Sequence, residues 1–307
     1  MSLTQKSGKI AIYGWALVIH AKGDIMLLHF FRHNHRRSGG LLFMGAIVCL
    51  LSLSFLAAAP VCAEKSKARL IMEKVDALDD GDNMVADMKM ILIDKNQNTR
   101  ERIMRTFAKD KGEDTLQLIF FTAPPAVKDT GFLTYDYDNT DKDDDQWLYL
   151  PALKKTKRIA AGDKTDAFMG SDFSYADMTS RVIDNYTYKL LKEDKVNGKK
   201  VWLIEAVPVN QDVIDTFGYT KSVAFIRQDN YYIVRAVSWV ADSDKLKYLD
   251  VRELEKIDGI WVAKETHMTT KRGGETQHKT ILIQDNIKFN QDLDESMFTV
   301  RRLEKGL

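Results

Sequence analysis

Cysteine and histidine, the side chains most often used in thiol and zinc chemistry, are scarce in residues 64–307. Both cysteines of the chain, Cys49 and Cys62, precede this part, and so do four of the six histidines, which leaves His267 and His278. A thiolate nucleophile and a cysteine-based zinc site are therefore excluded from it. The two histidines are expected on separate strands and have neither His-x-His nor His-x-x-x-His spacing, which favours structural over catalytic roles.

The turn at Gly170-Ser171-Asp172 is the one place where a hydroxyl nucleophile could be presented. A serine nucleophile needs a neighbouring base, and nothing in the sequence supplies one. Gly-x-Ser-x-Gly, His-Glu-x-x-His and a phosphate-binding glycine loop are all absent from the sequence. We therefore interpret Ser171 or Asp172 as the cap of a short helix over residues 173–178. We predict no catalytic residues, no cofactor and no enzymatic activity.

An acidic loop at residues 138–145 has the alternating carboxylates of a calcium loop at Asp141, Asp143 and Asp145. A calcium loop of this type requires Gly at its sixth position and Glu at its twelfth. The sequence has Gln146 and Ala152 at those positions. We therefore predict a solvated hairpin loop and no metal site.

The elements that must position these residues are short strands joined by tight turns. Residues 84–92 alternate apolar and mixed side chains, and Asn197-Gly198 is a strong hairpin signal. Hairpin connections imply antiparallel pairing, and a wide antiparallel sheet must curl. We predict a mainly β (α+β) fold, a strongly curved antiparallel half-barrel of about eleven strands with short helices over its concave face. An amphipathic helix is expected from Ser66 to Leu78.

Charge is unevenly distributed along the chain. Overall, 29% of residues are charged and the net charge is +1, but residues 1–63 hold six basic residues and one acidic residue. Residues 64–307 therefore carry a net charge of −4. Binding of a phosphate backbone requires a basic surface, which this mildly acidic composition does not predict. We therefore expect no nucleic-acid partner.

The N-terminal region has the pattern of a secretory signal. Residues 41–59 are uncharged, follow Arg32, Arg36 and Arg37, and lead into the small-residue stretch ending at Ala63. This predicts cleavage after Ala63, with residues 1–63 as extension and signal peptide and residues 64–307 as a single domain in the periplasm. An uncleaved membrane anchor is the alternative, because the apolar run is nearly long enough to span a bilayer.

The centre of the sequence, residues 147–178, contains a strand, a basic turn and a compact segment crowded with aromatic residues. We expect apolar side chains of this segment and of nearby strands to bind an apolar ligand, although ordinary core packing is the alternative for any single methionine. The basic turn could contact an anionic headgroup or an acidic partner, or be a solvated hairpin tip. The candidate ligand-binding residues are Met88, Met90, Leu150, Phe168, Met169, Phe173 and Tyr175, and the candidate headgroup or partner contacts are Lys154, Lys155, Lys157 and Arg158.

Two motifs in this centre carry a family resemblance. Leu-Pro-Ala-Leu-Lys-Lys-x-Lys-Arg-Ile at 150–159 and Asp-x-Phe-Met-Gly-Ser-Asp-Phe-Ser-Tyr-x-Asp-Met at 166–178 resemble the outer-membrane lipoprotein-sorting (LolA-like) family. The most similar branch is the one found alongside RND-type inner-membrane transporters. The resemblance covers residues 65–305 and implies a half-open antiparallel barrel that binds acyl chains in the periplasm.

These observations together predict a periplasmic, non-enzymatic carrier, working as a monomer. It would bind the acyl chains of a lipoprotein or another lipid and move them between the inner and outer membranes. An inner-membrane transporter is an expected partner. The alternatives are a regulatory protein that senses envelope lipids and an accessory subunit of an RND-type transporter.

Overall fold

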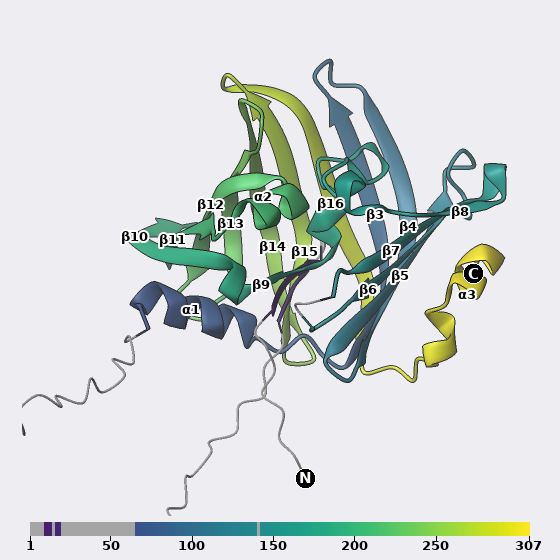
Figure 1. The fold of residues 1–307 in the computed structure, drawn as a ribbon, viewed down its shortest axis with the longest axis horizontal. Coiled ribbons are helices and arrows are strands. Elements are labelled where there is room, and N and C mark those ends of the chain that lie inside the picture. Colours follow the sequence, from purple (N-terminus) through teal and green to yellow (C-terminus); the bar gives the residue numbers. More distant parts are fainter. Residues whose placement is uncertain (1–8, 14–15, 20–64, 140–141) are drawn as a thin grey trace, which may run out of the picture.

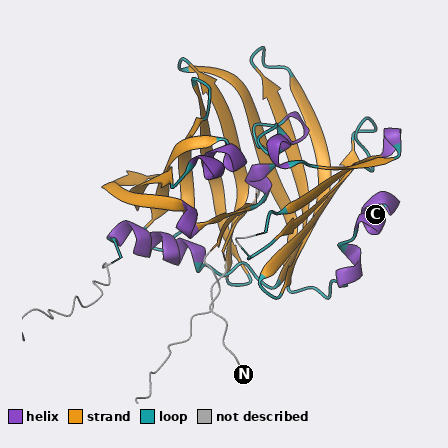
Figure 2. Ribbon diagram, viewed as in Figure 1, coloured by secondary structure: helices purple, strands orange, loops and turns teal. Residues whose placement is uncertain are grey.

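The computed structural model describes residues 9–13, 16–19, 65–139 and 142–307. Its main feature is a thirteen-stranded antiparallel sheet that curls without closing (Figures 1 and 2). The first half contains β3 (Asn83–Asp94), β4 (Thr99–Lys111), β5 (Asp114–Ala123), β6 (Gly131–Asp136), β7 (Asp145–Leu150) and β8 (Lys155–Arg158). The second half contains β10 (Tyr186–Val196), β11 (Lys199–Pro208), β12 (Tyr219–Arg227), β13 (Ile233–Val240), β14 (Lys245–Ile257), β15 (Ile260–Arg272) and β16 (Glu275–Phe289).

The order of the strands makes the centre of the sequence the connection between the two edges of the sheet. Each half is a meander in which neighbours in sequence pair, and the two halves join where β16 pairs with β3. The two free edges of the sheet are consequently β8 and β10. Residues 159–185 connect these edges and include the short 3-10 helices η2 (Ala161–Asp163), η3 (Phe168–Gly170), η4 (Ala176–Met178) and η5 (Ile183–Asn185).

The predicted half-barrel is confirmed, but the strand count was too low. Strand β8 lies within the predicted basic turn: η1 (Pro151–Leu153) and the left-handed residue Lys154 make the turn, and Lys155–Arg158 form an edge strand. The sequence Lys-Thr-Lys-Arg has no apolar alternation to reveal a strand. Charged residues on an edge strand also discourage pairing with another chain.

Two helices cover the concave face of the second half. Helix α1 (Lys67–Asp76) begins at Ser66, whose side chain accepts from the Arg69 N–H, and it buries Ile71 and Val75 against β10–β13. Helix α2 (Gln211–Phe217) packs Val213 and Phe217 against β10–β12. The predicted N-terminal helix and the predicted position of helices over the concave face are therefore confirmed.

The C-terminal segment covers the other surface of the first half. It includes η6 (Glu295–Met297) and α3 (Val300–Lys305), and it packs Phe298 and Leu303 against β4–β6 on their convex side (Figure 1). Gly131 permits this close approach, because a Cβ there would lie 2.5 Å from Leu303 Cδ1.

The N-terminal strands β1 (Lys9–Tyr13) and β2 (Ala16–Ile19) form a small antiparallel sheet with β9 (Ser180–Val182). The predicted cleavage after Ala63 would remove β1 and β2 from the mature chain. The uncharged run at 41–59 and the cleavage position lie outside the described residues. Within the described ranges, no helix is long and apolar enough to cross a membrane.

Candidate functional site

The candidate site is the concave face of the sheet and the segment that covers it, residues 159–178, which we call the plug. Its centre is a tight loop in which the Phe168 N–H donates to the Phe173 carbonyl at 2.8 Å. The tip places Met169 and Gly170 in the left-handed region, with φ of 50° and 72°. That conformation is uncommon for a residue with a side chain such as methionine. The tight loop therefore fixes where the plug's two phenylalanines point.

One side of the plug is apolar and faces the first half of the sheet. Phe168 and Phe173 are fully buried, and the Phe168 ring lies 5.0 Å from that of Phe132 and 5.7 Å from that of Tyr175. The cluster consists of Ile159, Phe168, Phe173 and Met178 from the plug and Met88, Met90, Leu92, Met104, Ile119, Phe121, Phe132, Leu148, Met268 and Leu282 from the sheet.

The structure brings all seven predicted ligand-binding residues into this one cluster. Met88, Met90, Phe168 and Phe173 are buried in it, whereas Leu150, Met169 and Tyr175 are partly buried and pack against it. Side chains from β7 and β15, far apart in the sheet, meet the same plug because the sheet is curved. That these residues bind a ligand remains a prediction.

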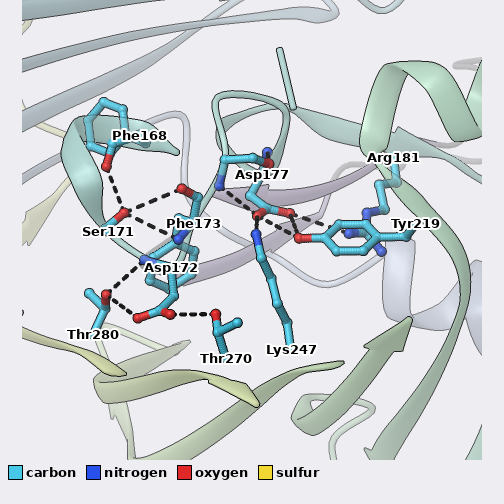
Figure 3. Close-up of polar contacts among 11 residues, drawn as sticks. Phe168, Ser171, Asp172, Phe173, Asp177, Arg181, Tyr219, Lys247, Thr270 and Thr280 are labelled. Atoms are coloured by element: carbon cyan, nitrogen blue, oxygen red, sulfur yellow. Dashed lines mark hydrogen bonds and ion pairs between the residues drawn. The ribbon is translucent and has the colours of Figure 1, made fainter. Parts of the chain in front are cut away.

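The other side of the plug carries Asp172, whose side chain is only 1% exposed. Its carboxylate accepts hydrogen bonds from the Thr270 and Thr280 hydroxyls (Figure 3). It also lies 2.7 Å from His278 Nδ1. The Asp172 N–H also donates to Thr280 Oγ1 at 2.9 Å. The predicted capping role is therefore wrong: Asp172 fastens the plug to β15 and β16. Ser171 instead closes the loop by donating to the Phe168 carbonyl at 2.8 Å.

A second buried carboxylate, Asp177, fastens the end of the plug. It accepts from the Tyr219 hydroxyl at 2.9 Å and lies 3.7 Å from Lys247 Nζ and 3.5 Å from Arg181 Nη2 (Figure 3). It also exchanges hydrogen bonds with Ser174, which makes a capping box at the start of η4. This cluster was not predicted, because its members lie up to seventy residues apart in sequence.

The environment of Asp177 shifts the ionisation of its neighbours. Burial, with the negative charge of Asp177, raises the pKa of Tyr219 to about 12, so its hydroxyl stays neutral and donates. Burial alone would lower the pKa of Lys247, but Tyr219 and Asp177 together raise it above its ordinary value. Lys247 therefore stays positively charged although it is largely buried.

The first half of the sheet makes fewer polar contacts with the plug, and these go mainly to its backbone. The Gln146 side chain donates to the Tyr175 carbonyl at 2.8 Å, and Arg102 donates to the Met169 carbonyl. The Arg102 guanidinium also lies 5.9 Å from the centre of the Phe121 ring. These two contacts hold the backbone of the plug and do not involve Asp172 or Asp177.

The four predicted basic residues lie at the edge of the sheet beside the start of the plug. All four are exposed; Lys157 Nζ lies 2.9 Å from Asp163 of the plug, and Arg158 pairs with Asp145. Asp145 belongs to the acidic loop. Its carboxylate therefore has two partners within the protein, Arg158 and the Tyr137 hydroxyl, which donates to it. In the part of the chain that the structure describes, no cluster of three or more potential metal ligands occurs.

Two cavities lie between the plug and the second half of the sheet. One of about 450 Å³ is bounded by Ser171 and Asp172 of the plug and by residues of β13–β16, including Lys247 and His278. The other, of about 380 Å³, continues from Thr165 and Lys247 towards α2. Space for a ligand therefore exists on the polar side of the plug, whereas its apolar side is packed.

A half-open antiparallel barrel, with its concave face covered by the segment that joins its edges, defines this class of protein. Solved structures of other proteins share this fold. An outer membrane lipoprotein-sorting protein domain from Vibrio parahaemolyticus is 31% identical, with a TM-score of 0.70 over 78% of this chain and 98% of that one. A DUF1329 family protein from Desulfovibrio piger is 27% identical, with a TM-score of 0.68 over 77% and 95% of the two chains.

A more distant solved structure and a family model also match this chain. A LolA superfamily protein from Nitrosomonas europaea, 15% identical, shares the fold with a TM-score of 0.59 over 78% of this chain and all of that one. A family model described as "Uncharacterized protein" matches residues 113–305, and no curated protein matches. The chain belongs to the same family as the outer membrane lipoprotein-sorting protein domain from Vibrio parahaemolyticus.

Proposed function

We propose that the protein is a periplasmic, non-enzymatic carrier of acyl chains. The chains, from a lipoprotein or another lipid, bind on the concave face and travel between the inner and outer membranes. The observation that carries the proposal is the apolar concave face, rich in methionine and phenylalanine and covered by a plug without long regular elements. The name of the similar lipoprotein-sorting protein domain from Vibrio supports the same class of cargo.

The plug and an acyl chain are energetically comparable occupants of this face. The plug buries four apolar side chains, Ile159, Phe168, Phe173 and Met178. At about 1.5–3 kcal/mol each they contribute roughly 6–12 kcal/mol, and an acyl chain of about fourteen methylenes contributes roughly 11 kcal/mol. Exchange of one for the other is therefore close to balanced. Methionines adapt their shape to either occupant.

A reversible crosslink of the plug tests this exchange. Asp172 and Thr280 share two hydrogen bonds, so cysteines at these positions are close enough for a disulfide. In the full chain carrying Cys49→Ser and Cys62→Ser, we expect Asp172→Cys with Thr280→Cys to bind a fluorescent long-chain fatty acid when reduced. Oxidation should lower that binding by roughly a hundredfold or more.

The background chain with only Cys49→Ser and Cys62→Ser is the control and should respond to neither reductant nor oxidant. Equal fatty-acid binding by the oxidised and reduced double-cysteine proteins would show that the ligand does not enter beneath the plug. Mass spectrometry of lipid extracted from the purified protein would then identify the cargo.

The proposed compartment has a separate test. N-terminal sequencing of the protein recovered from the periplasm should begin at Glu64. A chain retained in the membrane and beginning before residue 41 would instead support the uncleaved anchor.

A further inference from the structure

The larger cavity has a cationic wall. Lys247 and His278 line it from the sheet, Lys245 and Arg272 stand at its exposed rim, and the Thr270 hydroxyl also faces it. The single carboxylate among its lining residues is Asp172, which belongs to the plug. The neighbouring cavity is different, because the carboxylates of Asp215 and Asp242 line it with Lys247.

At the rim, Arg272 pairs with Asp244 in the turn before β14. The two carboxylates that engage the inner part of this wall are both carried by the plug. Asp172 engages Thr270, His278 and Thr280, and Asp177 engages Tyr219 and Lys247. These five partners belong to β12, β14, β15 and β16. Displacement of the plug therefore leaves Lys247 and a set of hydroxyl and imidazole groups on the sheet without their carboxylates. Once a lipid takes the place of the plug, Lys247 is covered again. A largely buried cation without a counter-ion is costly, so a lipid that brings an anion is favoured.

We propose that this cavity is a phosphate site for the polar head of the cargo, and that Asp172 and Asp177 are internal anions which that phosphate replaces. The proposal rests on the proposed function, since the acyl chains are what displace the plug. A phosphate accepts several hydrogen bonds, and lysine is a common phosphate-binding residue. The cavity volume of about 450 Å³ lies within the ordinary range for small-molecule sites.

The test compares two short-chain lipids with the same tails. Dihexanoyl phosphatidate carries the phosphate and dihexanoylglycerol lacks it, and calorimetry measures the binding of each to the full chain. We expect the wild type to bind the phosphatidate roughly tenfold tighter, as one charge-assisted interaction provides. Lys247→Met should reduce this preference to near parity. Lys221→Met is the matched control, because Lys221 lies 4.4 Å from the centre of the Trp239 ring and lines neither cavity.

The substitution Asp172→Asn tests whether Asp172 competes with the phosphate as an internal anion or has only a structural role. Loss of the competing charge should raise phosphatidate affinity several-fold while changing dihexanoylglycerol affinity less. A structural role alone would not favour the anionic lipid. Should Lys247→Met fail to fold, the paired change Thr270→Val with His278→Gln replaces it, and the same loss of preference is expected.

The outcomes distinguish this inference from the proposed function. Equal binding of the two lipids by the wild type overturns the phosphate site and leaves the acyl carrier intact. Binding of neither lipid overturns both. Inorganic phosphate that binds as tightly as phosphatidate, and is lost in Lys247→Met, supports the site and assigns it to free phosphate instead of a lipid head.

Discussion

The plug meets the two halves of the sheet in different ways. Mainly towards β3–β7 it presents phenylalanine and methionine side chains, which pack against apolar residues of the concave face; Met268 of β15 and Leu282 of β16 complete this contact. Towards β12–β16 it presents two buried carboxylates, which accept hydrogen bonds from side chains of β12, β15 and β16 and form an ion pair with Lys247 of β14. The apolar contact scales with area and accepts any occupant of similar size. The polar contact is directional and therefore fixes where the plug sits.

This difference assigns separate roles to the two contacts. Removing apolar atoms from the first contact should cost the most stability, because the lost burial and the cavity left behind add together. Removing one polar partner should cost less, but it should release the plug from a defined position. Substitutions on each side of the plug can therefore test whether the apolar contact mainly provides stability and the polar contact mainly fixes the position of the plug.

The largest effect is expected from Phe168→Ala. Phe168 is fully buried between the plug and β6, so its truncation should lower the free energy of unfolding by about 3–5 kcal/mol. Urea unfolding measures this change. Leu153→Ala is the control, since Leu153 is 62% exposed and its truncation should change stability by less than about 0.5 kcal/mol. A loss below about 1 kcal/mol for Phe168→Ala would contradict the energetic role of the apolar contact.

A smaller loss is expected from Asp172→Asn. The amide keeps the shape of the carboxylate and the backbone bond to Thr280, but it cannot accept from both threonines and His278 as before. The free energy of unfolding should fall by about 1–3 kcal/mol. Hydrogen exchange should show faster exchange of plug amides than of β3–β5 amides. A uniform change throughout the sheet would argue against a specific role in positioning the plug.

Tyr219→Phe should give an effect that depends on pH. The pKa of Tyr219 is raised to about 12 by burial beside Asp177, whereas an unfolded tyrosine ionises near pH 10. As pH rises, Tyr219 ionises in the unfolded state before it ionises in the folded state, and this favours unfolding. The stability contributed by Tyr219 is therefore present below pH 10 and is lost as pH rises towards 12. The wild type should exceed the variant by about 1 kcal/mol at pH 8. Urea unfolding at pH 8, 10 and 11 should show that the difference in unfolding free energy between wild type and variant becomes smaller as pH rises. A difference that stays constant would contradict a raised pKa of Tyr219.

The smallest effect is expected from Gln146→Leu on the apolar side. Gln146 donates one hydrogen bond to the Tyr175 carbonyl, but its own buried Oε1 accepts none within the described ranges. Loss of the bond and removal of an unsatisfied oxygen oppose each other, so stability should change by less than about 1 kcal/mol. A loss as large as that of Asp172→Asn would show that polar contacts fix the plug on both sides.

The sequence predicts the sheet and the apolar contact well, because both depend on local patterns. Alternation in residues 84–92 and the Asn197-Gly198 turn are visible without tertiary information, and aromatic crowding at 168–175 predicts burial. The polar contact could not be predicted, because the partners of Asp172 lie about one hundred residues later in sequence. Strand β8 was hidden by its charged sequence, and the C-terminal helix α3 is too short for a clear periodicity.

The pairing of β16 with β3 also has a kinetic consequence. Every other pair in the large sheet joins strands that are consecutive in it along the chain, whereas this pair closes a loop of nearly two hundred residues. Local hairpins form fast, and a contact of long sequence separation carries the cost of closing that loop. We therefore expect hairpins within each meander to form before the pairing of β3 with β16, which is expected to be the slow step. The partners of Asp172 lie on β15 and β16, whereas the apolar side chains of the plug pack mainly against β3–β7. The plug therefore makes its full set of contacts only after that union.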